Sequence, residues 1–361
     1  MCDPPRSERI PGWDGHGVVT RVDAETGAVM HVALHSDRLG PPSGGTRMKG
    51  YPTADDARRD AMRLAEAMTY KWAAAGFPRG GGKAVIDVPD GITGPARDGL
   101  LRRYGSLVKE LGGRFLTGPD VGTTPRDMDV ISETGAPWVF GRTEARGGTG
   151  GSGGWTALGV FVSIEAACER LFGSRAVRGR RVAIQGAGSV GGDLARRLAD
   201  AGASVEVADS DANAAARAAG DPRISVVPAG GVLSRDCDVL SPCALGGVLD
   251  AASIPALRCA AVVGAANNPL AGPDDAERLR GRGILYGPDF VVNAGGAIAV
   301  TGIEALGWSA ARAEAAVRGI AGTLRRVFEL ADAEGITTDA AARRIADEAL
   351  GSAGSKHISD R

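Results

Sequence analysis

The sequence predicts an α/β protein of two domains. Its 361 residues exceed the usual length of a single domain, so a second domain and a cleft between the two are expected. In the second half, a short apolar run over residues 181–185 is followed at once by the glycine-rich run GAGSVG. In the first half, an alternating segment over residues 17–36 precedes an apolar pattern of helical period. Strand and helix signals therefore occur in both halves, which favours the α/β class.

The first domain, residues 1–146, is expected to open with a hairpin followed by a helix. Residues 17–36 alternate apolar and polar on either side of a Thr-Gly pair, which is a hairpin signal. Thr53 then precedes Asp56 at the spacing of a capped helix start, and apolar positions recur at helical period until about residue 75. Gly76 is the expected C-cap of this helix.

Two lysines follow in this region, and each has a functional and a structural interpretation. Lys71 falls on or beside the apolar stripe of the helix, where a lysine is costly unless its stem snorkels. The three glycines at 80–82 predict a tight turn into an apolar strand, and such a turn would let Lys83 approach Lys71. Two amines in a poorly hydrated cleft disfavour each other's charge, so one is expected to act as a base. The alternatives for Lys83 are a solvated lysine or a point charge for phosphate; it is not part of a Walker A motif, because alanine follows it.

An acid closes the next predicted strand. A helix over about residues 95–111 leads to the run FLTGPDVG, in which Asp120 lies near the end of a strand, where parallel sheets usually place chemistry. The alternative is that Asp120 caps a helix beginning near Thr124. The run GGTGGSGG at 147–154 is expected to be the domain junction, with a helix opening at Thr156 beside the cleft.

The second domain, residues 147–331, is expected to bind a dinucleotide. The strand at 181–185, the G-x-G-x-x-G run, a helix and a second strand follow one another, and Asp209 comes 23 residues after the first glycine. The pyrophosphate is expected at the start of the helix, where free N–H groups and the helix dipole favour an anion. The residues expected at the dinucleotide phosphates are Gly186, Gly188, Ser189, Val190 and Gly191.

The strand ends favour NAD as the dinucleotide. Asp209 is expected to bind the ribose hydroxyls, and with Asp211 close behind it and no adjacent arginine, a 2′-phosphate would be repelled. Cys243, Ala244 and Asn267 end later apolar runs and are expected near the nicotinamide half of the cofactor. For Asn267, which begins an Asn-Asn-Pro run, an ordinary turn is the alternative.

Composition excludes several classes of function. With 42 basic and 43 acidic residues the net charge is −1, which lacks the basic excess expected of proteins that bind nucleic acid or anionic membranes. No apolar leader opens the chain, and the five cysteines are dispersed without a CxxC pair. We therefore expect a cytoplasmic protein without a metal site or a disulfide framework.

Over about residues 15–350, the chain resembles the glutamate/leucine/phenylalanine/valine dehydrogenase family. Eight motifs match in order. They are GGTRM (44–48), MTYKWAAAG (68–76), GGGKAVI (80–86), TGPDVGT (117–123), GAGSVG (186–191), SPCALGG (241–247), GAANNP (264–269) and PDFVVNAGGAI (288–298). The resemblance implies an NAD-dependent enzyme that oxidatively deaminates an L-amino acid to the 2-oxo acid and ammonia. It also implies a homo-oligomer assembled through the first domain.

The resemblance assigns roles to the residues singled out above. Lys71 matches the lysine that holds the substrate carboxylate, and Lys83 matches the lysine that activates water for attack on the imine. Asp120 matches the aspartate that exchanges protons with the amino group. Backbone near Gly40, together with Asn267, would orient the carboxylate. The nicotinamide carboxamide would be contacted by Thr156 and Asn267.

The substrate preference implied by the resemblance is a large apolar or aromatic side chain. Residues 40–43 offer only a serine hydroxyl to a distal carboxylate, which disfavours glutamate. Ala297 and its surroundings look like phenylalanine dehydrogenases, whereas TGPDVGTTPRDMD looks like the leucine and valine type, which stays the alternative. A catalytically inactive NAD-binding sensor is a remote alternative. A hydroxy acid dehydrogenase would need a histidine beside the nicotinamide, and none of the four lies in that region.

The end of the chain completes the prediction. A helix over about residues 332–350 is expected to pack back on the first domain. Residues 351–361 are small and polar and are expected to form a flexible tail.

Overall fold

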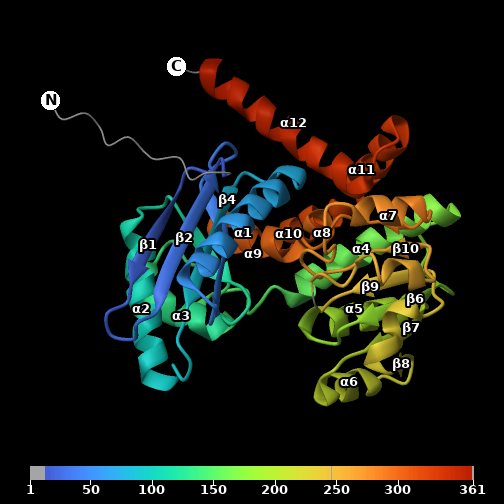
Figure 1. Cartoon of the computed structure of the whole chain (residues 1–361), viewed down its shortest axis with the longest axis horizontal. Coiled ribbons are helices and arrows are strands. Elements are labelled where there is room, and N and C mark those ends of the chain that lie inside the picture. Colours follow the sequence, from blue (N-terminus) through green and yellow to red (C-terminus); the bar gives the residue numbers. More distant parts are fainter. Residues whose placement is uncertain (1–12, 245, 360–361) are drawn as a thin grey trace. The chain divides into compact units, whose positions relative to one another are not determined.

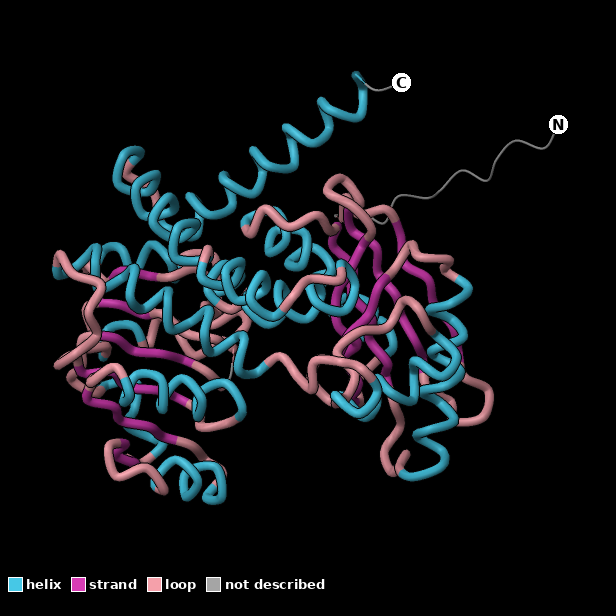
Figure 2. The backbone as a smooth tube through the Cα atoms, turned by 180° about the vertical axis from the view of Figure 1, so that it is seen from behind, coloured by secondary structure: helices cyan, strands magenta, loops and turns pink. Residues whose placement is uncertain are grey.

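The fold consists of two α/β units. The computed structural model describes residues 13–244 and 246–359, with side chains described up to residue 353. Internal contacts place residues up to Gly150 and those from Leu350 onward in unit 1, and Gly151–Ala349 in unit 2. Figures 1 and 2 show that each unit has its own sheet with helices packed against it. The predicted two-domain α/β class is confirmed.

Unit 1 contains a five-stranded mixed sheet with the order β1-β2-β4-β3-β5. The predicted hairpin is present, because β1 and β2 pair antiparallel from Gly17 opposite Leu34 to Val22 opposite Val29. Strand β3 lies parallel to both β4 and β5. The strand bounds are β1 (Gly17–Val22), β2 (Val29–Ser36), β3 (Pro42–Lys49), β4 (Gly80–Asp87) and β5 (Leu116–Pro119).

Helices cover both faces of this sheet. One face packs on α1 (Ala54–Ala74) through a small, alanine-rich cluster that includes Ala61 and Val85. The other face packs on α2 (Gly94–Glu110) and α3 (Pro125–Gly135) through a larger cluster that includes Ile86. The predicted cap of α1 is confirmed, since the Thr53 side chain accepts a hydrogen bond from the backbone N–H of Asp56. A short 3-10 helix, η1 (Glu144–Arg146), ends this part of the chain.

Strand alternation decides which side chains of β4 can take part in a polar site. Ala84 and Ile86 point into the larger cluster, whereas Val85 points toward α1. Because side chains alternate along a strand, Lys83 lies on the same face as Val85, beneath α1. The sheet thus separates a dry core on one face from a face that carries charge.

Unit 2 contains a six-stranded sheet with the order β11-β10-β9-β6-β7-β8, and every pairing in it is parallel. The chain leaves β6 toward β7 on one side and later returns to β9 on the other side. The direction of strand order therefore reverses between β6 and β9. Open parallel sheets bind ligands beside the strand ends at such a reversal, which is called a switch point. The strand bounds are β6 (Arg181–Gln185), β7 (Ser204–Ala208), β8 (Ile224–Val226), β9 (Val239–Pro242), β10 (Ala261–Val262) and β11 (Leu285–Tyr286).

Long helices pack on and beside this sheet. Helix α4 packs against α5, α9 and α11. The stretch Asp289–Leu306 is apolar enough to resemble a membrane span, but 67% of it is buried inside the fold, as in a core helix. The helix bounds are α4 (Gly153–Phe172), α5 (Ser189–Asp200), α6 (Ala212–Ala219), η2 (Ala229–Ser234), η3 (Ile254–Ala256), α7 (Asp275–Gly281), α8 (Asp289–Val292), α9 (Gly295–Leu306), α10 (Ala310–Arg318), α11 (Ile320–Glu334) and α12 (Thr338–Ser359).

Three expectations about local structure differ from what is observed. The glycines at 80–82 begin strand β4 rather than forming a tight turn. The helix expected from Thr156 begins three residues earlier, at Gly153. The segment expected to be a flexible tail from residue 351 is helical through Ser359, and residues 360 and 361 lie outside the described residues. The expected packing of residues 332–350 on the first domain, like the domain boundaries at 146 and 331, stays a prediction.

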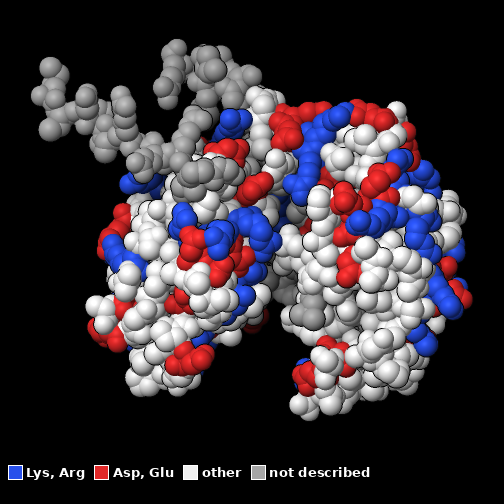
Figure 3. Space-filling view, viewed as in Figure 1, with Lys and Arg blue, Asp and Glu red and all other residues white. Residues whose placement is uncertain are grey.

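Charged side chains are mixed over the surface of both units. On the face drawn in Figure 3, lysines and arginines alternate with aspartates and glutamates. Many of these charges pair within one helix, as Arg59 does with Asp55 and Asp56 in α1. This distribution agrees with the net charge of −1.

Candidate functional site

Three charged side chains meet on the α1 face of the unit 1 sheet. The Lys83 Nζ atom lies 3.0 Å from Oδ1 of Asp120, and the Arg47 Nε atom donates to Oδ2 of Asp120 at 2.9 Å. The side chains are only 7%, 13% and 16% exposed for Lys83, Arg47 and Asp120. Both oxygens of one carboxylate are therefore held by separate cations in a nearly dry environment.

A second carboxylate, that of Asp60, also contacts the Arg47 guanidinium. Arg47 Nη1 donates to Oδ2 of Asp60 at 2.9 Å, and the Tyr51 hydroxyl donates to the same oxygen at 2.7 Å. Arg63, on the next turn of α1, reaches the other oxygen of Asp60 at 2.7 Å. We call Lys83, Asp120, Arg47 and Asp60 the charged relay. It draws one residue each from β4, the end of β5, β3 and α1.

The charges of the relay stabilise its carboxylates in the ionised form. Burial raises the pKa of Asp120, but the positive charges of Lys83 and Arg47 outweigh burial and bring the pKa down to about 2. For Asp60, burial also raises the pKa, and hydrogen bonds from Tyr51 and Arg63 lower it below its usual value. Burial lowers the pKa of Arg47, whereas the two carboxylates outweigh that effect and raise it. Their surroundings thus favour the charged forms of Asp120, Asp60 and Arg47.

Glycines bring the elements of this site close together. A Cβ at Gly81 would lie 1.9 Å from the Thr69 hydroxyl of α1, and one at Gly82 would lie 2.9 Å from the Phe115 ring on the other face. A Cβ at Gly45 would lie 2.8 Å from the Cβ of Asp120. Any side chain at these positions would separate the strands from their neighbours. The glycines therefore act by close packing rather than by making a turn.

The structure places the other residues predicted for unit 1 as follows. Lys71 lies in the last turn of α1 and is half-buried, as its position beside the apolar stripe predicts. Gly40 has a left-handed φ of 138° and would place a Cβ 2.7 Å from the Pro78 carbonyl oxygen. Asp120 is not a helix cap, because Thr124 caps α3 and forms a capping box with Asp127. That rules out the structural alternative for Asp120.

In unit 2, the glycine-rich run lies at the switch point of the sheet. Strand β6 ends at Gln185, and Gly186 follows with a φ of 99°. A Cβ at Gly191 would lie 1.9 Å from the Gly186 carbonyl oxygen, so these two glycines permit the tight passage from strand to helix. Gly188 is the N-cap of α5, with no side chain capping the helix and open space where a Cβ would be. The first turn, with Ser189 and Val190, is thus suited to an anionic group such as a pyrophosphate.

The predicted ribose-binding acid lies beside this run. Asp209 accepts a hydrogen bond from the backbone N–H of Ala187 at 2.6 Å and another from Asp211 at 2.8 Å. These two backbone bonds hold the pKa of Asp209 below its usual range, with a smaller contribution from the charge of Arg217. Asp209 is therefore an ionised acceptor next to the middle of the glycine run.

The residues predicted near the nicotinamide fall into two groups in unit 2. A Cβ at Gly186 would lie 2.8 Å from Ala244, and one at Gly191 would lie 3.3 Å from the Cβ of Cys243, so these residues adjoin the glycine run. Asn267 adjoins the same loop, since a Cβ at Gly246 would lie 2.6 Å from its carbonyl oxygen.

Thr156 belongs to the second group. Its hydroxyl donates to the Ser152 carbonyl within α4, and a Cβ at Gly296 would lie 2.4 Å from that hydroxyl oxygen. Ala297, the next residue, is half-buried near the start of α9. Thr156 and the segment that carries Ala297 are therefore neighbours.

Sequence reasoning missed four polar residues of these sites. Arg47, Asp60 and Tyr51 extend the environment of Asp120, and Asn293 donates to the side-chain oxygen of Asn267 at 2.9 Å. One signal for Arg47 was available. It lies in a strand between Thr46 and Met48, whose side chains point into the core, so alternation places Arg47 on the opposite face with Lys83.

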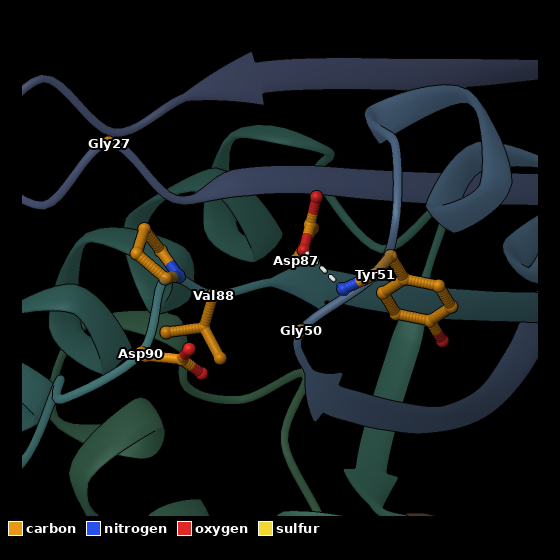
Figure 4. Close-up of a pocket in the computed structure, with 7 residues that line it drawn as sticks. Gly27, Gly50, Tyr51, Asp87, Val88 and Asp90 are labelled. Atoms are coloured by element: carbon orange, nitrogen blue, oxygen red, sulfur yellow. Dashed lines mark hydrogen bonds between the residues drawn. The ribbon is translucent and has the colours of Figure 1, made fainter.

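A separate cavity in unit 1 contains none of the predicted site residues. It has a volume of about 570 Å³ and is drawn in Figure 4. Asp87 accepts a hydrogen bond from the Tyr51 backbone N–H there at 3.0 Å, while the Tyr51 ring extends away from Asp90. The cavity is lined by Gly27, Gly50, Tyr51, Asp87, Val88, Pro89 and Asp90.

Two family models match the chain, one in each half. Residues 20–136 match the Glu/Leu/Phe/Val dehydrogenase dimerisation domain. Residues 147–220 and 212–346 match the Glutamate/Leucine/Phenylalanine/Valine dehydrogenase model. Together these matches cover most of the chain and both units.

Similar proteins agree with these matches. The chain is 38% identical to leucine dehydrogenase of Bacillus subtilis (strain 168), over 94% of this chain and 92% of that protein. It is 41% identical to valine dehydrogenase of Streptomyces virginiae, over 93% of this chain and 94% of that protein. The crystal structure of L-tryptophan dehydrogenase from Nostoc punctiforme superposes with a TM-score of 0.80 at 37% identity, covering 94% of this chain and 97% of that one.

Proposed function

The chain belongs to the Glu/Leu/Phe/Val dehydrogenase family, and from this premise we propose that it oxidatively deaminates an apolar or aromatic L-amino acid with NAD. As a member of this family it is an amino acid dehydrogenase, an oxidoreductase that acts on CH–NH2 donors and uses NAD or NADP. The proposed products are the 2-oxo acid and ammonia. The bound dinucleotide supplies the hydride acceptor.

The buried pair of Lys83 and Asp120 carries this proposal. Their side chains approach to 3.0 Å in a nearly dry environment, where a proton can pass between carboxylate and amine without loss to bulk water. In the proposed reaction, Asp120 takes a proton from the substrate ammonium group, and Lys83, once neutral, draws a proton from the attacking water. Retention of both groups disfavours the inactive sensor.

The proposed substrate contacts use the remaining polar groups of the predicted set. Lys71 would pair with the α-carboxylate as a point charge, since the residue is half-buried and a lysine can extend its ammonium from an apolar surface. Backbone near Gly40 and the side chain of Asn267 would fix the orientation of that carboxylate. Since Asn293 donates to the oxygen of the Asn267 amide, the NH2 group of Asn267 is left to donate outward.

NAD is the proposed dinucleotide, with the adenosine ribose on Asp209 and the pyrophosphate on the first turn of α5. Asp209 is ionised and has Asp211 beside it, so a 2′-phosphate would meet two carboxylates. Arg217 is close enough to act on Asp209 and would favour such a phosphate. For this reason NAD and NADP must be compared directly, in the wild type and in Arg217→Ala.

A phenylalanine-type side chain is the proposed preference, and a branched chain is the second candidate. Ala297 is a small residue near the start of α9, which would leave room for a ring. A relative that acts on tryptophan by its name supports an aromatic substrate, whereas relatives named for leucine and valine support the branched chain equally. One methylene changes discrimination by only about 1–3 kcal/mol, so the two ranges should overlap.

The test is formation of NADH, followed by absorbance at alkaline pH, from a panel of L-amino acids. The panel contains Phe, Tyr, Trp, Leu, Ile, Val, Met and Glu, with a 2-hydroxy acid as the class control. Lys83→Ala is the matched inactive variant, since it removes the proposed base and leaves unit 2 unchanged. Turnover of Phe above Leu and Val, absent in Lys83→Ala, would support the proposal. Turnover of Leu or Val alone would select the second candidate.

Two other outcomes would reject the proposal. If NAD binds but no amino acid is oxidised, an inactive NAD-binding sensor becomes the supported function instead of the enzyme. If Lys83→Ala keeps full activity, the assignment of the base is wrong.

We also propose that the protein is cytoplasmic and forms a homo-oligomer through unit 1. The oligomer is supported by residues 20–136, which match a domain described as a dimerisation domain. Light scattering on the purified chain tests the oligomer, and a monomeric mass would reject it.

A further inference from the structure

The two oxygens of Asp120 have partners of different chemistry. Oδ1 faces the Lys83 amine at 3.0 Å, and Oδ2 accepts from Arg47 Nε at 2.9 Å. A lysine amine that has lost a proton can accept a hydrogen bond, whereas a guanidinium has only donors and stays charged in proteins. The two oxygens are therefore not equivalent as proton acceptors.

A proton on Oδ2 would be opposed by its partner. An O–H group there would point a donor at the Arg47 N–H, and both groups are nearly buried, so neither could turn to water instead. A proton on Oδ1 meets no such obstacle, because a neutral Lys83 accepts the hydrogen bond. The arrangement thus favours proton uptake on the Lys83 side of the carboxylate.

Arg47 is itself held in this orientation by Asp60. Its Nη1 donates to Asp60 at 2.9 Å, and Asp60 is held by the Tyr51 hydroxyl at 2.7 Å and by Arg63 at 2.7 Å. The guanidinium therefore bridges two carboxylates and cannot swing away from Asp120 without giving up a second ion pair. A lysine at this position could reach one of the two carboxylates, but not both.

We propose that Arg47 is a positioning residue for the deamination: it occupies Oδ2 of Asp120 so that the carboxylate exchanges protons with the substrate nitrogen through Oδ1, beside Lys83. In that exchange a substrate N–H bond breaks and an Oδ1–H bond forms. The ammonium becomes a neutral amine and the carboxylate a neutral acid, so charge balances without another reactant. The inference rests on the proposed function, since it specifies how the same site handles its proton.

The test compares Arg47→Gln with Arg63→Gln, which is the matched control. Arg63 pairs with Asp60 from the outer side and is 52% exposed. Arg47→Gln frees Oδ2, removes a positive charge from the carboxylate, and is expected to raise the pKa of Asp120 by about 1–3 units. We therefore expect kcat to fall about 10- to 100-fold. Arg63→Gln should stay within about twofold of the wild type in kcat.

Infrared titration reads the carboxyl group without requiring turnover. The band of protonated Asp120 is identified by its loss when Asp120→Asn is added to Arg47→Gln. Between about pH 3 and 6 it should appear in Arg47→Gln and stay absent from both the wild type and Arg63→Gln. Equal bands in Arg47→Gln and Arg63→Gln would overturn the inference, as would a folded Arg47→Gln enzyme with the wild-type kcat.

Two further experimental outcomes each have a defined consequence. If Arg47→Gln does not fold, Arg47→Lys takes its place, because it keeps the charge but can hold only one carboxylate. Its infrared band of protonated Asp120 should appear at a lower pH than in Arg47→Gln but at a higher pH than in the wild type, and a wild-type titration would overturn the inference. If the wild type oxidises no amino acid, the proposed function fails, and the infrared comparison still decides whether Arg47 controls Asp120.

Discussion

Replacing Gly81 by alanine is expected to force helix α1 away from strand β4. A Cβ at Gly81 would lie 1.9 Å from the Thr69 Oγ1 atom and 2.5 Å from two backbone atoms, the Ala65 carbonyl oxygen and the Thr69 amide nitrogen. The hydroxyl can rotate away with its side chain, but the backbone atoms belong to the helix. Ordinary contact begins at 3.4 Å, so the helix must withdraw by about 0.9 Å from the strand.

This displacement should affect both stability and activity. Overpacking of this kind costs about 1–3 kcal/mol in the free energy of unfolding. It also moves Lys71 and Asp60, which lie on α1, relative to Lys83 on β4. A displacement of about 1 Å at a catalytic site lowers rates by about 100-fold, so kcat for the preferred amino acid should fall by that order.

Urea unfolding by circular dichroism and NADH formation measure the two effects. Gly50→Ala is the matched control, because a Cβ there meets only the Val88 carbonyl oxygen at 3.4 Å, and it should change stability by less than about 0.5 kcal/mol. Adding Thr69→Ala to Gly81→Ala removes the hydroxyl contact and leaves both backbone contacts. Full recovery in this double variant would refute the reasoning, because the clash would then be one of side chains alone.

Three further predictions concern stability. Because the pKa of Asp120 lies near 2, below the ordinary 3.8, its ionised form stabilises the fold above pH 3.8 by about 2 kcal/mol, and this is lost as the pH falls through 2. Between pH 6 and 3, urea unfolding of the wild type should therefore weaken by about 1 kcal/mol more than that of Asp120→Asn, and parallel curves would contradict the pKa. Thr124→Ala removes the capping box of α3 and should cost about 1 kcal/mol in urea unfolding, whereas Thr124→Ser should retain most of it; an equal loss in both would exclude the cap as the cause. The buried Thr46 hydroxyl forms hydrogen bonds of 2.6 Å with the hydroxyls of Tyr104 and Thr117. Tyr104→Phe should therefore lower the free energy of unfolding by about 1 kcal/mol, and Thr46→Val should lower it by more. If thermal unfolding ranks the two variants in the reverse order, the tyrosine hydroxyl is the more important partner.

Local patterns predicted the regular elements of both units well. Thr53 and the apolar stripe predicted α1 with its cap, and strand β6 covers residues 181–185 as the apolar run indicates. The glycine spacing with Asp209 predicted the passage from β6 to α5, and Asp209 does lie against the glycine run. These features depend on residues near one another in the chain, so the sequence is sufficient to predict them.

Other features depend on contacts between distant residues. Three consecutive glycines are typical of a turn, and only the approach of Thr69 and Phe115 explains why they form a buried strand instead. Arg47 and Asp60 each resemble ordinary surface charges in the sequence, and their pairing follows from the packing of α1 on the sheet. The expected approach of Lys83 to Lys71 stays a prediction, whereas the contact of Lys83 with Asp120 follows from the packing of distant strands.

The division of strand β4 into two faces limits how this region can change. Substitution alters one position, but insertion or deletion of a single residue would turn every later side chain of the strand to the opposite face. With one residue inserted at the start of the strand, Lys83 would enter the apolar cluster in the place of Ala84, and Gly82 would take the place beside Asp120. A single slip would thus remove the Lys83 charge from Asp120 and bury that charge in the apolar core. The length of this strand should therefore be far less tolerant of change than its composition.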